Sequence, residues 1–198
     1  IYINTAGVGT MLAGADIAPT NITAGMDIIV SGTLGDHAAT VMAARHGLTL
    51  PPEIQSDCAP LCHLTAAMIA AAGDGIAVLR DPTRGCAAAS LNELAGAAGF
   101  GVLLEEDAIP VRPAVQGVCE MLGFDPLTLA NEGKLLAFVR PEVTARVLDV
   151  MHENPYGREA CVIGHTTADA PGTVGLRTAL GGIRVVDLPL GELVPRIC

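Results

Sequence analysis

The sequence contains few aromatic and few basic residues. Its 198 residues include no Trp, two Tyr and three Phe, so a core has to be built from aliphatic side chains, alanine and glycine. Eleven basic residues stand against 21 acidic ones, which gives a formal charge of −10, and Lys134 is the only lysine. A nucleic-acid-binding surface needs clustered cations, and an anionic membrane repels an acidic protein. The composition therefore predicts neither a nucleic-acid partner nor a membrane partner.

Long hydrophobic runs and targeting signals are also missing from the sequence. No apolar run reaches the ~20 residues of a membrane span, and the opening IYINTAGVG does not have the form of a signal peptide. The cysteines at positions 58, 62, 86, 119, 161 and 198 lack disulfide-framework spacing. This favours free thiols and a cytoplasmic location. Because the chain begins without Met inside a strand-like run, we expect a piece of a longer protein.

The hydrophobic periodicity alternates between strand-like and helix-like segments. With 51% hydrophobic and 16% charged residues, the chain is too apolar to be disordered. The expected strands are 1–8, 28–31, 76–79, 99–105, 135–139 and a final meander of 160–164, 173–177 and 183–188. The expected helices are 36–46, 59–72, a small-residue helix ending at 98, 113–122 and one that begins at 141. We predict an α+β (α/β-like) fold with a mixed β-sheet flanked by helices.

Residues 81–86 read DPTRGC and lie between an expected strand and an expected helix. Such a junction directs free N–H groups at an anion, and the helix dipole adds to the attraction. Asp81 is a candidate for holding Mg²⁺ or capping the helix, and Arg84 for pairing with a phosphate. The alternative, which the local pattern favours, is a plain capping turn with a surface arginine.

Two further turns carry polar residues beside expected strands. SGTLGDH (31–37) opens a helix, where Asp36 is either a simple N-cap or a site residue and His37 is either a surface histidine or part of the same site. ANEGK (130–134) places Asn131 and Glu132 before a buried strand. Glu132 is either a general base or a residue of a solvated turn, and the local pattern favours the turn.

The cysteines offer weaker signals. Cys58 and Cys62 have poor spacing for a structural zinc site, and Cys62 and Cys119 fit helix interiors, so we predict no metal site. Cys198 follows an arm bounded by prolines and is either an incidental thiol or a functional one. The α-carboxylate beside this thiol disfavours the thiolate, so activation needs a nearby arginine or a pocket that supplies cations.

Five motifs together carry a resemblance to a known family. The motifs are SGTLGDH (31–37), DPTRG (81–85), NELAGAAG (92–99), LANEGK (129–134) and PRIC (195–198). In this order they resemble the carboxyl-terminal part of the HypE hydrogenase-maturation family, within the superfamily of aminoimidazole ribonucleotide synthetase and selenophosphate synthetase. The resemblance covers the whole chain. It implies a remnant of an amino-terminal ATP-binding domain at 1–24, a carboxyl-terminal α+β domain at 25–188 and a flexible tail at 189–198.

The resemblance also implies a reaction. A partner carbamoyltransferase loads a carbamoyl group on the terminal cysteine, ATP activates the carboxamide oxygen, and dehydration yields a thiocyanate whose cyanide passes to iron on a maturation scaffold. By position, Cys198 is the carbamoyl acceptor, Glu132 is a partly desolvated base and Asn131 positions it. The residues that the resemblance assigns to ATP phosphates, to catalysis or to the lining of the cleft are Asp81, Thr83, Arg84, Gly85, Asp36 and His37.

The sequence departs from the family pattern at two positions and in its extent. The family usually reads DPTRGG and GDHG, whereas this chain has Cys86 and Ala38 in place of the last glycines. A Cβ at position 86 is expected to crowd a phosphate. The resemblance implies that most of the Mg-ATP site and of the homodimer surface belong to the amino-terminal half, so we expect the 198-residue chain alone to turn over no ATP. The alternatives are a non-enzymatic carrier of Cys198 and a synthetase of selenophosphate or purine type.

Overall fold

The computed structural model describes residues 3–4, 6–49, 51–52, 54–83 and 86–189. The helices in these ranges are α1 (Asp36–Arg45), α2 (Cys62–Ala72), α3 (Cys86–Ala98), α4 (Pro113–Leu122) and α5 (Pro141–His152). The strands are β1 (Asp27–Val30), β2 (Ile76–Arg80), β3 (Gly101–Glu105), β4 (Leu136–Val139), β5 (Cys161–Thr167), β6 (Val174–Arg177) and β7 (Ile183–Val185). The expectation of an α+β domain with a mixed sheet and flanking helices is confirmed.

The seven strands form one sheet in the order β2-β4-β1-β5-β3-β6-β7. Neighbouring strands are antiparallel except β3 and β6, which run parallel. At the β2 edge, the N–H of Ala18 donates to the carbonyl of Ala77, so the segment before β1 covers part of this edge. β7 forms the other edge and its three residues are exposed.

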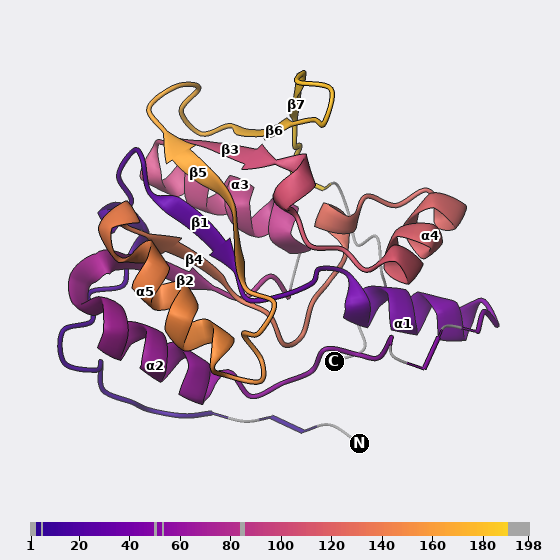
Figure 1. Cartoon of the computed structure of the whole chain (residues 1–198), viewed down its shortest axis with the longest axis horizontal. Coiled ribbons are helices and arrows are strands. Elements are labelled where there is room, and N and C mark those ends of the chain that lie inside the picture. Colours follow the sequence, from indigo (N-terminus) through magenta and orange to yellow (C-terminus); the bar gives the residue numbers. More distant parts are fainter. Residues whose placement is uncertain (1–2, 5, 50, 53, 84–85, 190–198) are drawn as a thin grey trace.

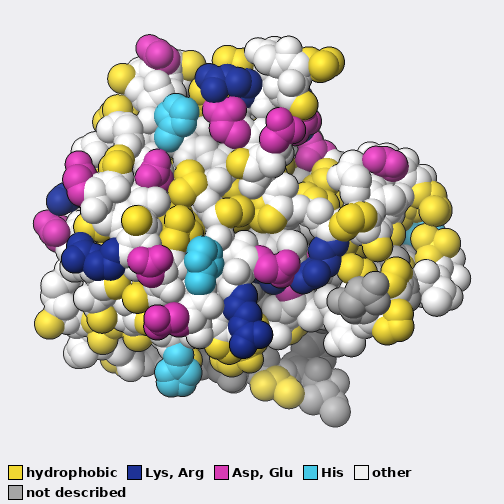
Figure 2. Space-filling model, viewed as in Figure 1, with side chains coloured by type: hydrophobic (Ala, Val, Ile, Leu, Met, Phe, Trp, Pro, Cys, Tyr) yellow, Lys and Arg dark blue, Asp and Glu magenta, His cyan; other side chains and the backbone are white. Residues whose placement is uncertain are grey.

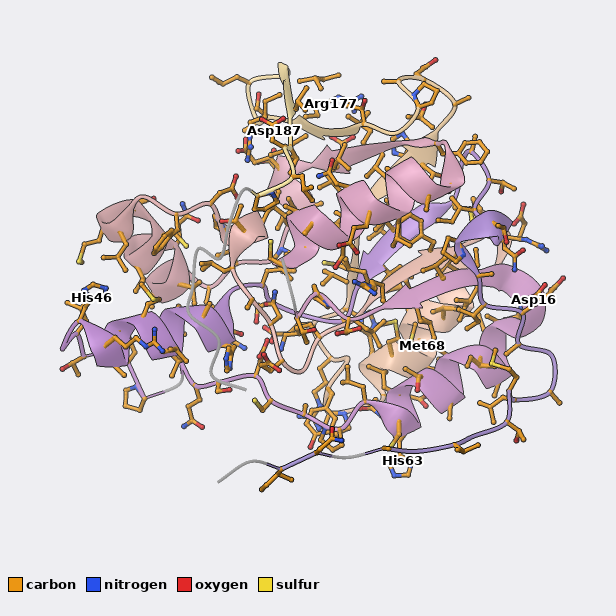
Figure 3. The ribbon with its side chains drawn as sticks, turned by 180° about the vertical axis from the view of Figure 1, so that it is seen from behind. Asp16, His46, His63, Met68, Arg177 and Asp187 are labelled. Atoms are coloured by element: carbon orange, nitrogen blue, oxygen red, sulfur yellow. The ribbon has the colours of Figure 1, made fainter. Side chains whose placement is uncertain are left out.

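Helices cover both faces of the sheet, as Figure 1 shows. Ile28 and Val30 of β1 face the cluster built on α3, whereas Ile29 faces the cluster built on α2 and α5. This alternation is the two-residue period of a strand that is buried on both faces. In the view from behind, Met68 lies on the sheet side of α2 (Figure 3), and its side chain is fully buried.

α1 and α4 form a smaller hydrophobic cluster beside the sheet. Ala38 and Ala39 of α1 pack against Val115, Val118 and Cys119 of α4. The small alanine side chains let the two helices approach closely. On the face shown in Figure 2, dark blue Lys and Arg side chains lie among magenta Asp and Glu side chains. Within the described ranges, no helix is both long and apolar enough to cross a membrane.

Some expectations about secondary structure are wrong. The described residues of 1–8 form no strand and are exposed, with no neighbouring strand to pair with. α2 begins at Cys62 rather than at 59, because Ala59 precedes Pro60 and the residue before a proline avoids the helical region. Cys62 is therefore exposed at the first position of its helix and does not lie in a helix interior.

The last three strands are not a meander, because β3 lies between β5 and β6. The chain after β5 folds over the start of β3, where the N–H of Gly172 donates to the carbonyl of Phe100. Gly101 permits this close crossing, since a Cβ there would lie 2.1 Å from the carbonyl oxygen of Asp169. β6 therefore pairs with β3 from the far side and runs parallel to it.

Phe138 on β4 is a sensitive probe of this core, because it is 1% exposed and is the largest fully buried side chain. We predict that Phe138→Ala lowers the free energy of unfolding by about 3 to 5 kcal/mol, since it removes buried apolar area and leaves a cavity. Urea unfolding monitored by circular dichroism measures the change. Leu180→Ala, at a 99% exposed position, is the control and is expected to stay within about 0.5 kcal/mol of the parent. Similar losses in both variants would contradict the assigned core.

Candidate functional site

Three of the sequence motifs meet at one place, and the fully buried side chain of Asn131 joins two of them. Its Oδ1 accepts a hydrogen bond from the N–H of Gly35 at 2.8 Å, and its Nδ2 donates to the carbonyl of Leu129 at 2.9 Å. Its backbone N–H donates to the carbonyl of Pro82 at 3.2 Å. Asn131 therefore connects the 129–134 turn to both the 31–37 turn and the 81–83 turn.

Gly35 is the N-cap of α1 and has a φ of +86°. This left-handed conformation favours glycine, and a Cβ here would also lie 3.0 Å from the side chains of Leu129 and Val115. The interpretation of Asp36 as the N-cap is therefore wrong. Asp36 is the first residue of the helix proper, where its carboxylate interacts favourably with the helix dipole.

The Asp36 side chain is buried in a polar cluster. Its Oδ2 accepts hydrogen bonds from the Thr33 hydroxyl at 2.5 Å and from Nε of Arg112 at 3.4 Å. Its Oδ1 has no hydrogen-bond partner among the described residues. The guanidinium of Arg112 also pairs with Glu159 at 2.9 Å, so it bridges α1 to the loop before β5.

His37 lies next to Asp36 but contacts a different loop. Its Nδ1 is 2.9 Å from Oγ of Ser56, and the Ser56 hydroxyl donates to Sγ of Cys58 at 3.2 Å. The Cys58 sulfur is 4.0 Å from the same His37 nitrogen. The structure therefore brings together an exposed thiol, a hydroxyl and an imidazole that no sequence motif had connected.

Glu132 is half-buried, and its backbone N–H donates to Oδ1 of Asp57 at 2.9 Å. The other oxygen of Asp57 lies 3.6 Å from Nζ of Lys134. Gly133, between Glu132 and Lys134, packs directly on the 57–59 segment, since a Cβ there would lie 1.8 Å from the carbonyl oxygen of Asp57. The half-burial of Glu132 agrees with the partial desolvation expected of it.

The 81–86 turn is described except for Arg84 and Gly85, which lie outside the described residues, as does Cys198. Asp81 is exposed and accepts a hydrogen bond from the Thr83 hydroxyl. Cys86 has a φ of +68°, a left-handed conformation that favours glycine. The backbone N–H groups of Ala89 and Ala88 lie near its sulfur, at the first turn of α3.

The buried thiols are poorly suited to nucleophilic chemistry. Burial raises the pKa of the Cys119 thiol to about 11, with Asp125 and Glu120 adding to the effect. Burial also raises the pKa of Cys86, although the two N–H groups at its sulfur oppose the shift, and it raises the pKa of Cys161. Because the thiolate is the reactive form, these cysteines are structural.

The described part of the chain contains no cluster of three or more His, Cys, Asp or Glu side chains that could hold a metal ion. His46, at the far end of α1, and His63, near the start of α2, lie far from each other in Figure 3. Neither histidine belongs to the connected turns.

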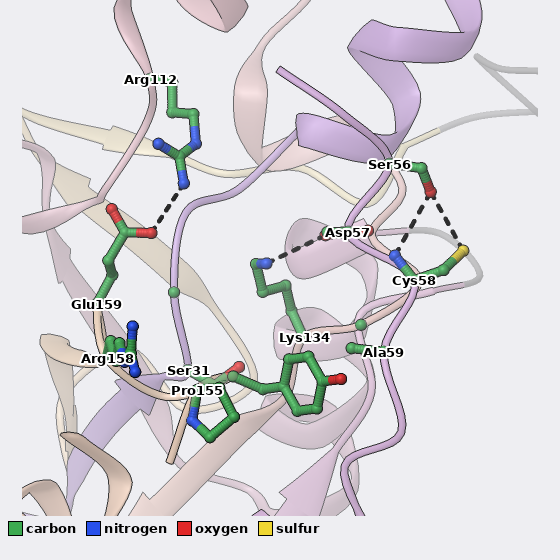
Figure 4. Close-up of a pocket in the computed structure, with 13 residues that line it drawn as sticks. Ser31, Ser56, Asp57, Cys58, Ala59, Arg112, Lys134, Pro155, Arg158 and Glu159 are labelled. Carbon is green, nitrogen blue, oxygen red and sulfur yellow. Dashed lines mark hydrogen bonds and ion pairs between the residues drawn. The ribbon is translucent and has the colours of Figure 1, made fainter. Parts of the chain in front are cut away.

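A polar pocket of about 240 Å³ adjoins the 129–134 turn (Figure 4). Its charged lining residues are Asp57, Arg112, Lys134, Arg158 and Glu159. Sequence reasoning noticed only Lys134 among them, because the other four lie in segments without a recognisable motif. The available signal in the sequence was the small number of basic residues, 11 against 21 acidic ones, which makes any group of cations noteworthy.

The chain matches the family model "AIR synthase related protein, C-terminal domain" over residues 23–177. The fold, the three turns joined at Asn131 and this match identify the class of protein. The chain belongs to the AIR synthase related family and carries its C-terminal domain.

Within that class, the expected resemblance to HypE is confirmed. The chain is 50% identical over its 198 residues to "Carbamoyl dehydratase HypE" of Rhodobacter capsulatus, and it is 48% identical to the protein of the same name from Bradyrhizobium diazoefficiens. A crystal structure of the hydrogenase maturation protein HypE superposes with a TM-score of 0.90 at 38% identity, covering 95% of this chain and 60% of that chain.

Two other solved structures show HypE with its binding partners. A HypE–HypF complex matches with a TM-score of 0.83 at 38% identity, covering 89% of this chain and 57% of that chain. A HypE complex with ATP matches with a TM-score of 0.86 at 38% identity, covering 92% of this chain and 55% of that chain. The chain spans 58% of the length of the Rhodobacter capsulatus relative.

We predict that Asn131→Ala lowers the free energy of unfolding of the domain. The substitution leaves the buried N–H of Gly35 without its 2.8 Å acceptor. A buried unsatisfied donor costs about 1 to 3 kcal/mol, so the free energy of unfolding is expected to fall by about 2 kcal/mol. Urea unfolding measures the loss, and Asn4→Ala at an exposed position is the matched control. A loss below about 0.5 kcal/mol in Asn131→Ala would show that the junction does not depend on this amide.

A second prediction concerns the backbone at Cys86. Both Cys86→Ala and Cys86→Gly remove the buried sulfur, but only glycine accepts the φ of +68° without strain. The glycine variant is therefore expected to be about 1 kcal/mol more stable than the alanine variant. Ala97→Gly in the same helix provides the control, because at a helical position glycine is about 1 kcal/mol less favourable than alanine. The prediction fails if alanine is the more stable residue at position 86.

Proposed function

We propose that this chain is the carboxyl-terminal half of an ATP-dependent carbamoyl dehydratase of hydrogenase maturation. The observation that carries the proposal is the junction at Asn131, which joins LANEGK to SGTLGDH and to the 81–83 turn. Sequence identity of 50% over the entire chain to a carbamoyl dehydratase HypE supports it. The alternative functions are synthesis of selenophosphate and synthesis of purine precursors. The PRIC motif (195–198) disfavours both.

The proposed substrate is a carbamoyl group on the sulfur of Cys198. ATP transfers its terminal phosphoryl group to the carboxamide oxygen, which turns a very poor leaving group into a good one. Glu132 takes protons from the nitrogen, and loss of phosphate leaves a C≡N group on sulfur. The net reaction removes one water from S–C(=O)NH₂ and hydrolyses one ATP to ADP and phosphate. Such proton transfer needs the base within hydrogen-bond reach of the nitrogen.

The remaining residues are proposed to serve ATP and the cleft. Asp81 is exposed, with only the Thr83 hydroxyl at its carboxylate among the described contacts, so it fits a role in holding Mg²⁺ near the phosphates. Arg84 and Gly85 are proposed to contact the phosphates, and Asp36 and His37 to line the same cleft. Asn131 is proposed to act as a positioning residue, because its side chain bonds to the backbone of the neighbouring turns.

The first turn of α3 is a poorer fit to a phosphate. The side chain of Cys86 stands at the start of α3, near the N–H groups of Ala88 and Ala89, where the family pattern has a glycine, so it crowds an anion approaching these groups. The phosphates would have to use the amino-terminal half, to which the family resemblance assigns most of the Mg-ATP site. The proposed ATP requirement of the longer protein is supported by the HypE structure with ATP.

The proposed partners follow from the same reaction. The HypE–HypF complex supports a carbamoyltransferase that loads Cys198. We further propose that an iron-bearing maturation scaffold accepts the cyanide and that the longer protein is a homodimer. The Cys198 thiol has to be reduced to accept the carbamoyl group, as it would be in the cytoplasm.

We predict that Glu132→Gln blocks dehydration but not loading. The full-length protein, with its amino-terminal half, is loaded by the carbamoyl-transfer system and then given ATP. The parent is expected to gain about 43 Da and then fall to a net gain of about 25 Da, as expected for carbamoyl and then cyano on sulfur. The variant is expected to keep the 43 Da adduct, with conversion slowed by about 10²- to 10⁴-fold, the usual contribution of a general base.

The exposed Glu153→Gln substitution is the matched control for intact-mass spectrometry and is expected to convert normally. Normal conversion by Glu132→Gln would remove this carboxylate from the mechanism. An unconverted adduct on the parent protein itself would favour the alternative in which the domain only carries Cys198.

A further inference from the structure

An exposed thiol, a hydroxyl and an imidazole meet beside the 129–134 turn. Ser56 and Cys58 belong to the loop before α2, and His37 is the second residue of α1. Nδ1 of His37 is 2.9 Å from Oγ of Ser56 and 4.0 Å from Sγ of Cys58, and the hydroxyl oxygen is 3.2 Å from the sulfur. The three side chains therefore form one group in mutual contact. The reaction proposed above gives no role to Ser56 or Cys58.

The hydrogen bonds of Ser56 direct its single proton at the sulfur. Its Oγ accepts from the backbone N–H of Cys58 at 3.4 Å and donates to the Cys58 sulfur at 3.2 Å, and Figure 4 shows both contacts. A hydroxyl has one proton and two lone pairs, so the second lone pair is left for His37, whose ring then carries a proton on Nδ1. A protonated ring nitrogen beside a sulfur that accepts a hydrogen bond is the arrangement that suits a thiolate, which is the nucleophilic form of cysteine.

Three other cysteines of the described chain differ from Cys58. Cys62 is also exposed, but its sulfur has no hydrogen-bond partner within the described ranges. The Cys161 thiol donates to the carbonyl of Ala108 at 3.5 Å, a contact that keeps its proton on sulfur. Cys119 is buried. Cys58 thus combines exposure with a hydroxyl that donates to its sulfur and with a neighbouring imidazole.

The pocket of about 240 Å³ contains a second feature that points to a ligand. Ser56, Asp57 and Cys58 all line this pocket. The Asp57 side chain is 2% exposed, its Oδ2 has no hydrogen-bond partner among the described residues, and Nζ of Lys134 stays 3.6 Å away. A buried carboxylate oxygen without a donor favours a ligand that brings an O–H or N–H group. The lining therefore offers both a nucleophile and a hydrogen-bond acceptor to a small polar molecule.

We propose that Cys58 is a modification site for a small peroxide, with Ser56 and His37 holding its sulfur in the reactive form. Hydrogen peroxide is a small polar molecule that brings two O–H donors and a weak O–O bond. The thiolate attacks one peroxide oxygen, so an S–O bond forms, the O–O bond breaks and the sulfur gives two electrons to the peroxide. The proton that His37 took from the thiol passes to the leaving hydroxide, which becomes water. The net reaction converts R–SH and H₂O₂ into R–SOH and H₂O.

Competition between two cysteines of one molecule tests the proposal. The full-length protein is reduced, separated from the reductant and treated with hydrogen peroxide, and dimedone traps the sulfenic acid that forms. Neither ATP nor a carbamoyl donor is present, so the result is independent of the proposed function. Mass spectrometry of peptides measures trapping at Cys58 and at Cys62, which are both exposed but differ in their neighbours. We expect Cys58 to react about 10-fold faster than Cys62.

Substitutions of the two neighbouring side chains give a second readout. Ser56→Ala removes the donor at the sulfur and His37→Gln removes the ring, so each is expected to slow trapping at Cys58 by about 10-fold without changing Cys62. Ser56→Thr keeps the hydroxyl and is expected to restore most of the rate. His63→Gln, at an exposed histidine next to Cys62, is the matched control and should leave both rates unchanged.

Three outcomes would overturn the inference. Equal rates at Cys58 and Cys62 would reject a special reactivity of Cys58. A fast reaction that survives both Ser56→Ala and His37→Gln would attribute it to exposure alone. Fast alkylation of Cys58 by iodoacetamide without fast trapping after peroxide would assign the thiol to carbon electrophiles instead. Each of these results leaves the proposed dehydration intact, and a failure of dehydration in its own assay leaves this inference intact.

Discussion

The buried amide of Asn131 is the interaction on which the arrangement of the site depends. An asparagine side chain both accepts and donates, so one residue satisfies the N–H of Gly35 and the carbonyl of Leu129. Its backbone N–H reaches Pro82 in a third turn. Buried polar groups are costly unless they are paired, so the three turns are held in one geometry rather than in several. Glu132 takes its position from this junction.

Close backbone packing is the second constraint on the site. Gly133 lies directly on the 57–59 segment, where any side chain would collide with the backbone. This contact brings Asp57 against the N–H of Glu132 and near the ammonium of Lys134. The pocket and the proposed base are therefore parts of one packed unit. Cys86 shows the opposite situation, in which a residue with a Cβ occupies a left-handed position at the start of α3.

Local charge, rather than net charge, decides what the site can bind. The chain is acidic, so long-range attraction to any anion is weak. Arg112, Lys134 and Arg158 nevertheless converge on one cavity from separate parts of the chain. Two of these cations face carboxylates, because Arg112 lies 3.4 Å from Asp36 and 2.9 Å from Glu159, and Lys134 lies 3.6 Å from Asp57.

The sequence by itself determined the fold class, most helix and strand positions and the turns that matter. Alternating apolar residues, Pro113 and Pro141 at helix starts and glycines at helix ends act locally, so their effects can be read without a structure. Only the tertiary structure decided the order of the strands, the position of β3 between β5 and β6, and the polar contacts of Asp57, Arg112 and Arg158. These depend on which distant backbones can approach closely and on which buried polar groups find partners, and neither is encoded in the spacing of residues along the chain.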